Sequence, residues 1–174
     1  RLETAAMMIK SCRTDLRLCL WDLRNDALNE PDFATAIRET VTPVAGSANV
    51  SVRFTGHRSQ ISDSTAHALL SILRELLSNA VTHGKASRFS ISGLIKDRQL
   101  RIAGEQRSQM IRFSVQDNGC GFDTTTRPGQ NEGHFGLDGI QERMNRIGGT
   151  LDISSTPAHG TYIRLAINHS PPKS

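Results

Sequence analysis

Apolar side chains recur at heptad spacing through the first part of the chain. This repeat of about 3.5 residues predicts one helix over residues 1–28 that packs along another helix, as in a coiled coil or a bundle. An amphipathic helix lying on its own domain is the alternative, and the sustained heptad favours the first interpretation. Glu30-Pro31 ends this helix. The heptad positions are Leu2, Ala5, Ile9, Cys12, Leu16, Cys19 and Leu23.

Two further helices follow, each with its own boundary signals. Asp32 suits the N-cap of a short helix over Phe33–Thr42, which Pro43 would end. A longer helix is predicted over residues 63–82, with Gly84 as its stop. Its wide apolar stripe predicts burial of one face: Ala66, Leu69, Leu70, Leu73, Leu76, Leu77 and Ala80.

Strand patterns fill most of the remaining chain. Lys96–Gln109 is charged and is expected to be an extended hairpin loop, and Asp117–Phe135 is expected to be a long mobile loop. Helices in one half and strands in the other predict an α/β two-layer sandwich. The other expected elements are strands at 49–54, 89–93, 111–115, 150–154 and 161–167, a helix at 137–147, and a frayed tail at 168–174.

Length and composition limit the possible functions. The 174 residues are enough for one domain with a substantial core, and no apolar run approaches the roughly 18 residues of a membrane-spanning helix. Three cysteines without metal-ligand spacing favour a reducing compartment. The net charge is +4, but basic residues are scattered and aromatic residues are 5 %, which disfavours a nucleic-acid-binding module. The chain starts at Arg1 rather than Met, so we expect a piece of a longer protein.

Glu75, Asn79 and His83 form the first candidate site. They step by four, so they project from one face of the predicted helix while the leucines face the core. A carboxylate, an amide and an imidazole aligned in this way offer ligands to a hard cation or a phosphate. The alternative is an ordinary solvated face, although asparagine is a poor helix former and its mid-helix place favours a function.

Two glycine-bearing segments are the other candidates. Asp117-Asn118-Gly119-Cys120-Gly121-Phe122 follows a strand, and its glycines allow positive φ and close approach of a ligand; a simple hairpin turn is the alternative. Gly133-His134-Phe135-Gly136-Leu137 opens a helix, where free N–H groups favour a phosphate; a flexible linker is the alternative. The three clusters in this order are much harder to obtain by chance than any one of them.

Together these residues resemble the nucleotide-binding boxes of the Bergerat-fold (GHKL) ATPases, which include gyrase and sensor histidine kinases. Glu75-x-x-x-Asn79 matches the asparagine box, Asp117-x-Gly119-x-Gly121 and Gly133–Leu137 the glycine boxes, and Gly160-Thr161 the last box. Trp21-Asp22-Leu23-Arg24 resembles the end of the second helix of the dimerisation and phosphoacceptor hairpin in nitrate-sensor and desaturase-sensor kinases. Residues 133–153 resemble the same subfamily: GHFGLDGIQERMNRIGGTLDI.

The resemblance implies a mixed β-sheet covered by helices on one face. It divides the chain into a truncated hairpin helix (1–30), an ATP-binding catalytic domain (31–168) and a tail (169–174). It also implies ATP and Mg²⁺ as cofactors. The lid over the phosphates would be formed by roughly residues 122–135, and the longer segment 96–109 would be a surface insertion.

The resemblance also implies roles for single residues. Asp117 would accept the adenine amino group, with Gly119 and Gly121 making room for the base and Thr161 beneath it. Asn79 would ligate magnesium. Glu75 matches the carboxylate that activates water in hydrolysing relatives, and in the kinases it would instead help the phosphoacceptor histidine. The other expected contacts with the nucleotide are His83, Lys85, Phe122, Gly133, His134, Phe135, Gly136 and Leu137.

The function implied is the ATP-binding catalytic region of a two-component sensor histidine kinase, which donates the ATP γ-phosphate to a histidine. The resemblance places that histidine on a helix before Arg1, so this chain alone is expected to bind ATP without phosphorylating itself. An anti-sigma-type serine kinase of the same fold and a non-catalytic docking or dimerisation module are the alternatives. The hairpin motif disfavours the first, and the intact boxes disfavour the second.

Partners follow from the same resemblance. We expect ATP, a response regulator receiver domain and a second copy bound through the N-terminal helix, without direct nucleic-acid binding. This portion is expected in the cytoplasm, and an inner-membrane anchor of the parent protein is left open.

Overall fold

The computed structural model describes residues 26–98, 108–124 and 135–169. These residues form a five-stranded sheet with the order β1-β2-β3-β5-β4, in which β1 is parallel to β2 and the other neighbours are antiparallel. The elements are η1 (Asp26–Asn29), α2 (Phe33–Ala45), β1 (Asn49–Thr55), η2 (Arg58–Gln60), α3 (Asp63–Thr82), β2 (Arg88–Arg98), β3 (Ser108–Asp117), α4 (Phe135–Arg146), β4 (Gly149–Ser155) and β5 (Thr161–His169).

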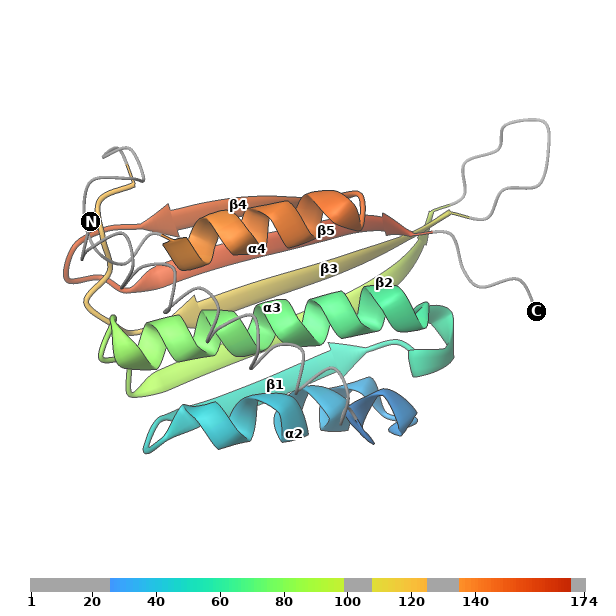
Figure 1. Cartoon of the computed structure of the whole chain (residues 1–174), viewed down its shortest axis with the longest axis horizontal. Helices are drawn as coiled ribbons and strands as arrows, with labels where there is room; N and C mark the ends of the chain where they lie inside the picture. Colours follow the sequence, from blue (N-terminus) through green and yellow to red (C-terminus); the bar gives the residue numbers. More distant parts are fainter. Residues whose placement is uncertain (1–25, 99–107, 125–134, 170–174) are drawn as a thin grey trace, which may run out of the picture.

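The helices α2, α3 and α4 cover one face of the sheet and lie in front of the strands in Figure 1. Strand residues alternate between this covered face and the opposite face, as their period of two dictates. No described helix lies on the opposite face, which is called the uncovered face below. The prediction of a two-layer sandwich with a mixed sheet is therefore confirmed. Buried side chains on the covered face are Val52, Phe89, Ile91, Gln109, Ile111, Phe113, Val115, Ile163, Leu165 and Ile167.

An aromatic cluster joins the start of α2 to the sheet. The Phe33 ring centroid lies 5.1 Å from that of Phe54, and Phe54 stacks on Phe113 at 5.6 Å. Gly93 lies between these rings, because a Cβ there would overlap the Phe113 ring and approach the Phe54 ring at 2.7 Å. A side chain at this position would therefore displace the Phe54 and Phe113 rings, against which Phe33 of α2 packs.

Side-chain caps begin α2 and α3. The Asp32 carboxylate accepts hydrogen bonds from the N–H groups of Ala34 and Thr35 at 3.3 and 3.2 Å. The Thr35 hydroxyl also donates to this carboxylate at 2.7 Å and is the main cause of a lowered Asp32 pKa. The Ser62 hydroxyl accepts from Thr65 N at 3.3 Å and caps α3, which has the predicted bounds.

The sequence predicts that α2 stops at Thr42, but in the structure the helix continues to Ala45. Pro43 has no N–H group, so the helix loses only the hydrogen bond to the Glu39 carbonyl. The last turn of a helix tolerates the loss of this one bond. The helix ends at Gly46, whose φ of +58° is accessible to glycine at little cost.

Several other predicted boundaries also shift. Strands β2 and β3 pair from Phe89↔Asp117 out to Arg98↔Ser108, so the predicted loop at 96–109 is too long. Strand β5 pairs with β3 up to His169, so residues 168 and 169 are not a frayed tail. Helix α4 starts at Phe135 rather than at Leu137 and ends at Arg146.

The N-terminal prediction is only partly testable. Residues 26–28, expected to end the first helix, belong instead to the short 3-10 helix η1. The rest of the heptad helix and residues 170–174 lie outside the described residues, as does most of the predicted loop at 117–135. Within the described ranges, none of the helices combines the length and hydrophobicity needed to span a bilayer.

Candidate functional site

Four elements meet at one end of the sheet, on the left of Figure 1: the end of α3, the end of β3, the start of β5 and the start of α4. They surround a cavity of about 190 Å³. Residues from all three sequence clusters and from the Gly-Thr pair thus come together, although they are far apart in the chain. The lining residues are Leu76, Asn79, Ala80, His83, Gly84, Asp117, Cys120, Gly121, Phe122, Leu137, Thr161 and Ile163.

Asp117 is the acidic residue of this cavity. It ends β3 on the helix-covered face, opposite Thr161 of β5. Burial raises the pKa of Asp117 above its ordinary value of 3.8, and hydrogen bonds from Gly119 and Thr161 partly oppose this rise. The bond from Gly119 N to Asp117 Oδ1 measures 2.8 Å. A half-buried carboxylate held by donors in a cavity is suited to accept one more N–H group from a planar ligand.

The raised pKa predicts a pH dependence of stability. Folded Asp117 binds a proton more readily than the unfolded chain does, so its contribution is fully present below the ordinary pKa of 3.8 and is lost as pH rises through the higher folded pKa. Denaturant unfolding across this range should show the wild type losing stability with rising pH relative to Asp117→Asn. Equal pH dependence of the two proteins would contradict the raised pKa.

Gly119, Gly121 and Gly160 are required by the packing of the chain around the cavity. A Cβ at Gly119 would lie 2.7 Å from the Gly84 oxygen, and one at Gly121 would overlap the Thr156 oxygen. Gly121 and Gly160 also have φ of +61° and +76°. The space beside these glycines is thus filled by protein backbone, and their expected role in making room for a base stays a prediction.

The segment after Asp117 does not form the hairpin turn that was the alternative. Instead of returning as a strand beside β3, it crosses the end of α3, where Cys120 N donates to Gly84 O at 2.7 Å. Cys120 O then accepts from Ala158 N at 2.6 Å, in the turn between β4 and β5. The segment therefore connects three elements around the cavity.

The end of α3 supplies the polar side chains that helical spacing predicts. Asn79 and His83 both line the cavity, and the Asn79 amide makes no hydrogen bond to another described residue. Glu75 lies one turn earlier and is not part of the lining. Lys85 is also outside the lining, and its Nζ donates to Thr82 O at 3.0 Å. Of the four residues Glu75, Asn79, His83 and Lys85, the structure thus brings Asn79 and His83 to the cavity.

The residues present fit a magnesium ion that is shared with a nucleotide. In the part of the chain that the structure describes, no group of three or more His, Cys, Asp and Glu side chains could hold a metal ion. Magnesium in nucleotide sites usually takes one or two protein oxygens together with phosphates and water. The free amide oxygen of Asn79 can supply such a ligand.

Helix α4 places its first turn at the cavity. Leu137 lines the cavity, and Gly136 and Phe135 precede it in the same turn. The Arg143 guanidinium fixes α4 to α3 by donating to Ser71 Oγ at 2.7 Å. The unpaired N–H groups of a helix start favour an anion. The other two residues of this cluster, Gly133 and His134, lie outside the described residues.

Asn118 and Ser155 support the site in ways the sequence reasoning missed. Asn118 Oδ1 accepts from Ser87 N at 3.0 Å and Arg88 N at 2.8 Å, which joins the end of β3 to the start of β2. Ser155 Oγ accepts from Phe122 N and donates to Gly160 O, both at 2.9 Å. Asn118 could have been found from the sequence, because it lies within the Asp117–Phe122 motif. Ser155 could not, because its contact with Phe122 depends on how β4 pairs with β5.

Comparison with known proteins identifies the family of this chain. Residues 64–171 match the family described as histidine kinase-, DNA gyrase B- and HSP90-like ATPases. The histidine-protein kinase/phosphatase DegS of Brevibacillus brevis is 29 % identical over 92 % of this chain. The nitrate/nitrite sensor protein NarQ of Escherichia coli is 32 % identical over 56 % of it. The chain spans 38 % and 15 % of the lengths of these two relatives.

Solved structures show the same fold. The histidine kinase domain of the blue-light activated kinase of Erythrobacter litoralis has a TM-score of 0.54 at 18 % identity, covering 79 % of this chain and 60 % of its own. The ATP-binding domain of PrrB from Mycobacterium tuberculosis has a TM-score of 0.52 at 18 % identity, covering 82 % and 96 %. The chain therefore belongs to the family of histidine kinase-, DNA gyrase B- and HSP90-like ATPases, and the resemblance to sensor histidine kinases is confirmed.

Proposed function

We propose that this chain is the ATP-binding catalytic region of a two-component sensor histidine kinase. In this proposal it donates the γ-phosphate of ATP to a histidine on a helix outside the chain. The observation that carries the proposal is the half-buried Asp117 carboxylate in a cavity with Asn79 and His83. The Asp117 carboxylate already accepts hydrogen bonds from Gly119 and Thr161. It can accept a further hydrogen bond, which suits the amino group of adenine.

The phosphates would lie toward the ends of the two helices. Asn79 and His83 reach the cavity from α3, and Leu137 marks the first turn of α4, where helix N–H groups favour anions. Charge neutralisation on the phosphate oxygens is the chemistry that magnesium supplies when bound beside Asn79. Phosphoryl transfer depends mainly on such positioning and electrostatic stabilisation.

Glu75 is the proposed catalytic residue for the transfer step. It lies one turn before Asn79 on the same helix, outside the cavity lining, where a second helix could bring a histidine to it. A carboxylate there would orient the attacking imidazole. We assign His83, Lys85, Gly133 and His134 to the phosphates in the same proposal, and Lys85 would first have to leave the Thr82 carbonyl.

Calorimetric titration with ADP and a non-hydrolysable ATP analogue tests the nucleotide site. We expect both to bind the wild type more tightly with magnesium than without it. Asn79→Ala should remove the magnesium-dependent part and leave the rest, because Asn79 is the protein ligand in this proposal. The matched control is Asn145→Ala, an exposed asparagine of α4. Failure of the wild type to bind any nucleotide would favour a docking module instead.

The partners follow as part of the same proposal. A response regulator receiver domain would take the phosphate from the histidine, and a second copy would bind through residues 1–24. Sensor kinases are the named relatives, which supports both. Light scattering that shows only monomer at several concentrations would contradict the dimer.

A further inference from the structure

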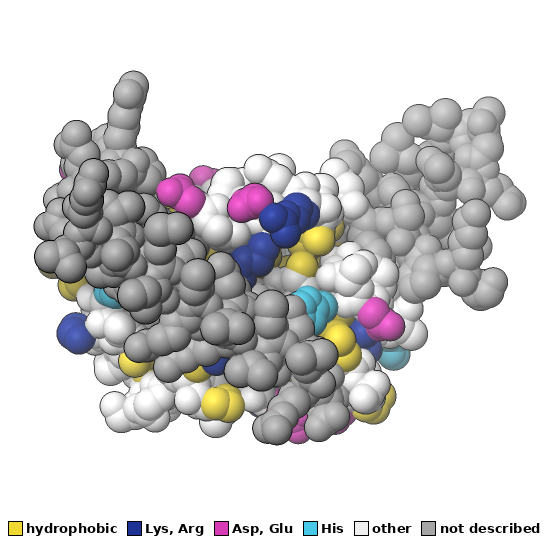
Figure 2. Space-filling model, in the orientation of Figure 1, with side chains coloured by type: hydrophobic (Ala, Val, Ile, Leu, Met, Phe, Trp, Pro, Cys, Tyr) yellow, Lys and Arg dark blue, Asp and Glu magenta, His cyan; other side chains and the backbone are white. Residues whose placement is uncertain are grey.

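The uncovered face of the sheet is strongly basic. Exposed cationic side chains lie on it from four of its five strands. Among the described residues, Asp152 is the only acidic side chain at a strand position that alternates onto this face, and it pairs with Arg164. Asp117, at the end of β3, reaches the edge of this face as well. The helix side differs, since Figure 2 shows basic and acidic side chains near one another there. The cationic residues of the uncovered face are Arg53, Arg88, Lys96, Arg112 and Arg164.

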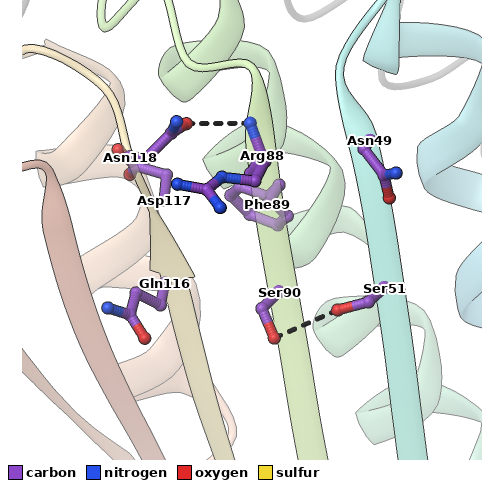
Figure 3. Close-up of a pocket in the computed structure, with 8 residues that line it drawn as sticks. All are labelled: Asn49, Ser51, Arg88, Phe89, Ser90, Gln116, Asp117 and Asn118. Atoms are coloured by element: carbon purple, nitrogen blue, oxygen red, sulfur yellow. Dashed lines mark hydrogen bonds between the residues drawn. The ribbon is translucent and has the colours of Figure 1, made fainter.

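A depression of about 450 Å³ lies on this face across β1, β2 and β3 (Figure 3). Asn49, Arg88 and Gln116 border it from the three strands, and their side chains make no hydrogen bond to another described residue. Asp117 lines its end beside Asn118, so a carboxylate fits on the side of Arg88 and Asn49, away from Asp117. Ser51 Oγ donates to Ser90 Oγ at 3.2 Å across the depression. A guanidinium beside amides and hydroxyls supplies the donors that a carboxylate accepts.

Tyr162 adds an apolar contact to the same face. It is 38 % exposed and is the only exposed large hydrophobic residue in the described ranges. Its hydroxyl donates to Ser114 Oγ at 3.2 Å, which holds the ring on the sheet. Tyrosine and arginine are the residues that most often dominate binding energy in protein interfaces.

We propose that the uncovered face binds an acidic surface of another protein, with one of its carboxylates in the depression beside Arg88. A second copy that presents the same face does not fit, because two basic faces repel each other. The undescribed segments of this chain do not fit either, since none of them carries more acidic than basic residues. Single-stranded nucleic acid is disfavoured because base stacking needs several aromatic side chains, and this face has only Tyr162 among the described residues.

The test is an NMR titration of the isotope-labelled chain with an oligoglutamate peptide at low salt. We expect amide shifts concentrated on β1, β2 and β3, and binding that weakens as salt rises. Arg88→Glu should weaken binding at least about tenfold, the loss expected for one interface anchor. Arg146→Glu is the matched control, because it changes the net charge equally at an exposed position on α4, and it should alter affinity by less than about twofold.

Three outcomes would overturn the proposal. Equal losses in Arg88→Glu and Arg146→Glu would show that only net charge matters. Shifts confined to other surfaces would place the binding elsewhere. Tighter binding of an oligothymidylate to the same face would assign it to nucleic acid. Thermal unfolding checks that Arg88→Glu is folded, and Arg53→Glu on β1 provides a second variant of the same face with the same expected loss.

Discussion

Replacing Asp117 with alanine is expected to lower the affinity for ADP by about 5- to 150-fold. The variant removes the acceptor for the adenine amino group and leaves the Gly119 N–H and the Thr161 donors without their partner. In the complex the buried adenine amino group would lack its acceptor. An unpaired buried polar group costs about 1–3 kcal/mol, which corresponds to that range of affinities. Calorimetric titration with ADP measures the loss directly, and magnesium should not restore it.

The control for this prediction is Asp152→Ala. Asp152 is an exposed carboxylate on β4 that pairs with Arg164 on the uncovered face, so its removal changes the net charge equally without touching the cavity. We expect its ADP affinity to match the wild type. Asp117→Asn is a shape-preserving second variant, and it should also bind weakly because its amide places a donor among donors. Wild-type ADP affinity in Asp117→Ala would refute the assignment of Asp117 as the residue that binds adenine.

Local patterns predicted the elements of this fold well, because each pattern reports one element. The apolar stripe and Gly84 predict the extent of α3, and the alternation in β2 and β3 identifies their buried side chains. Pro43 misled the prediction of α2, since the general rule against proline in helices is weak in a last turn. The ends of β2, β3 and β5 were missed because pairing with a neighbour extends a strand beyond its own alternation.

The site itself could be predicted only as separate clusters. That Asp117 faces Thr161 follows from the pairing of β3 with β5, which are separated by α4 and β4 in the chain, and no local pattern encodes that register. The same holds for Ser155, which reaches Phe122 through the β4–β5 pair. The sequence did not predict the basic uncovered face for the same reason. Its arginines are far apart in the sequence, and only the strand order shows that they lie on one face.

Replacing Gly121 with alanine is expected to destabilise the fold and to weaken nucleotide binding together. The added Cβ would overlap the Thr156 oxygen and lie 2.9 Å from the Gly160 oxygen, so the segment after Asp117 must move. Overpacking of this kind costs about 1–3 kcal/mol. Because Phe122 follows directly and lines the cavity, the shift should also lower ADP affinity by about tenfold, or 1.4 kcal/mol.

Gly148→Ala separates this steric effect from backbone strain. Gly148 has a φ of +66°, close to the +61° of Gly121, but a Cβ there meets nothing within 4 Å. Its alanine variant should therefore lose only the roughly 1–2 kcal/mol of a left-handed residue and keep wild-type ADP affinity. Denaturant unfolding of both variants measures the difference, which isolates the contact with Thr156. Equal losses of stability in the two variants, with ADP affinity unchanged in both, would show that this contact does not hold the segment in place.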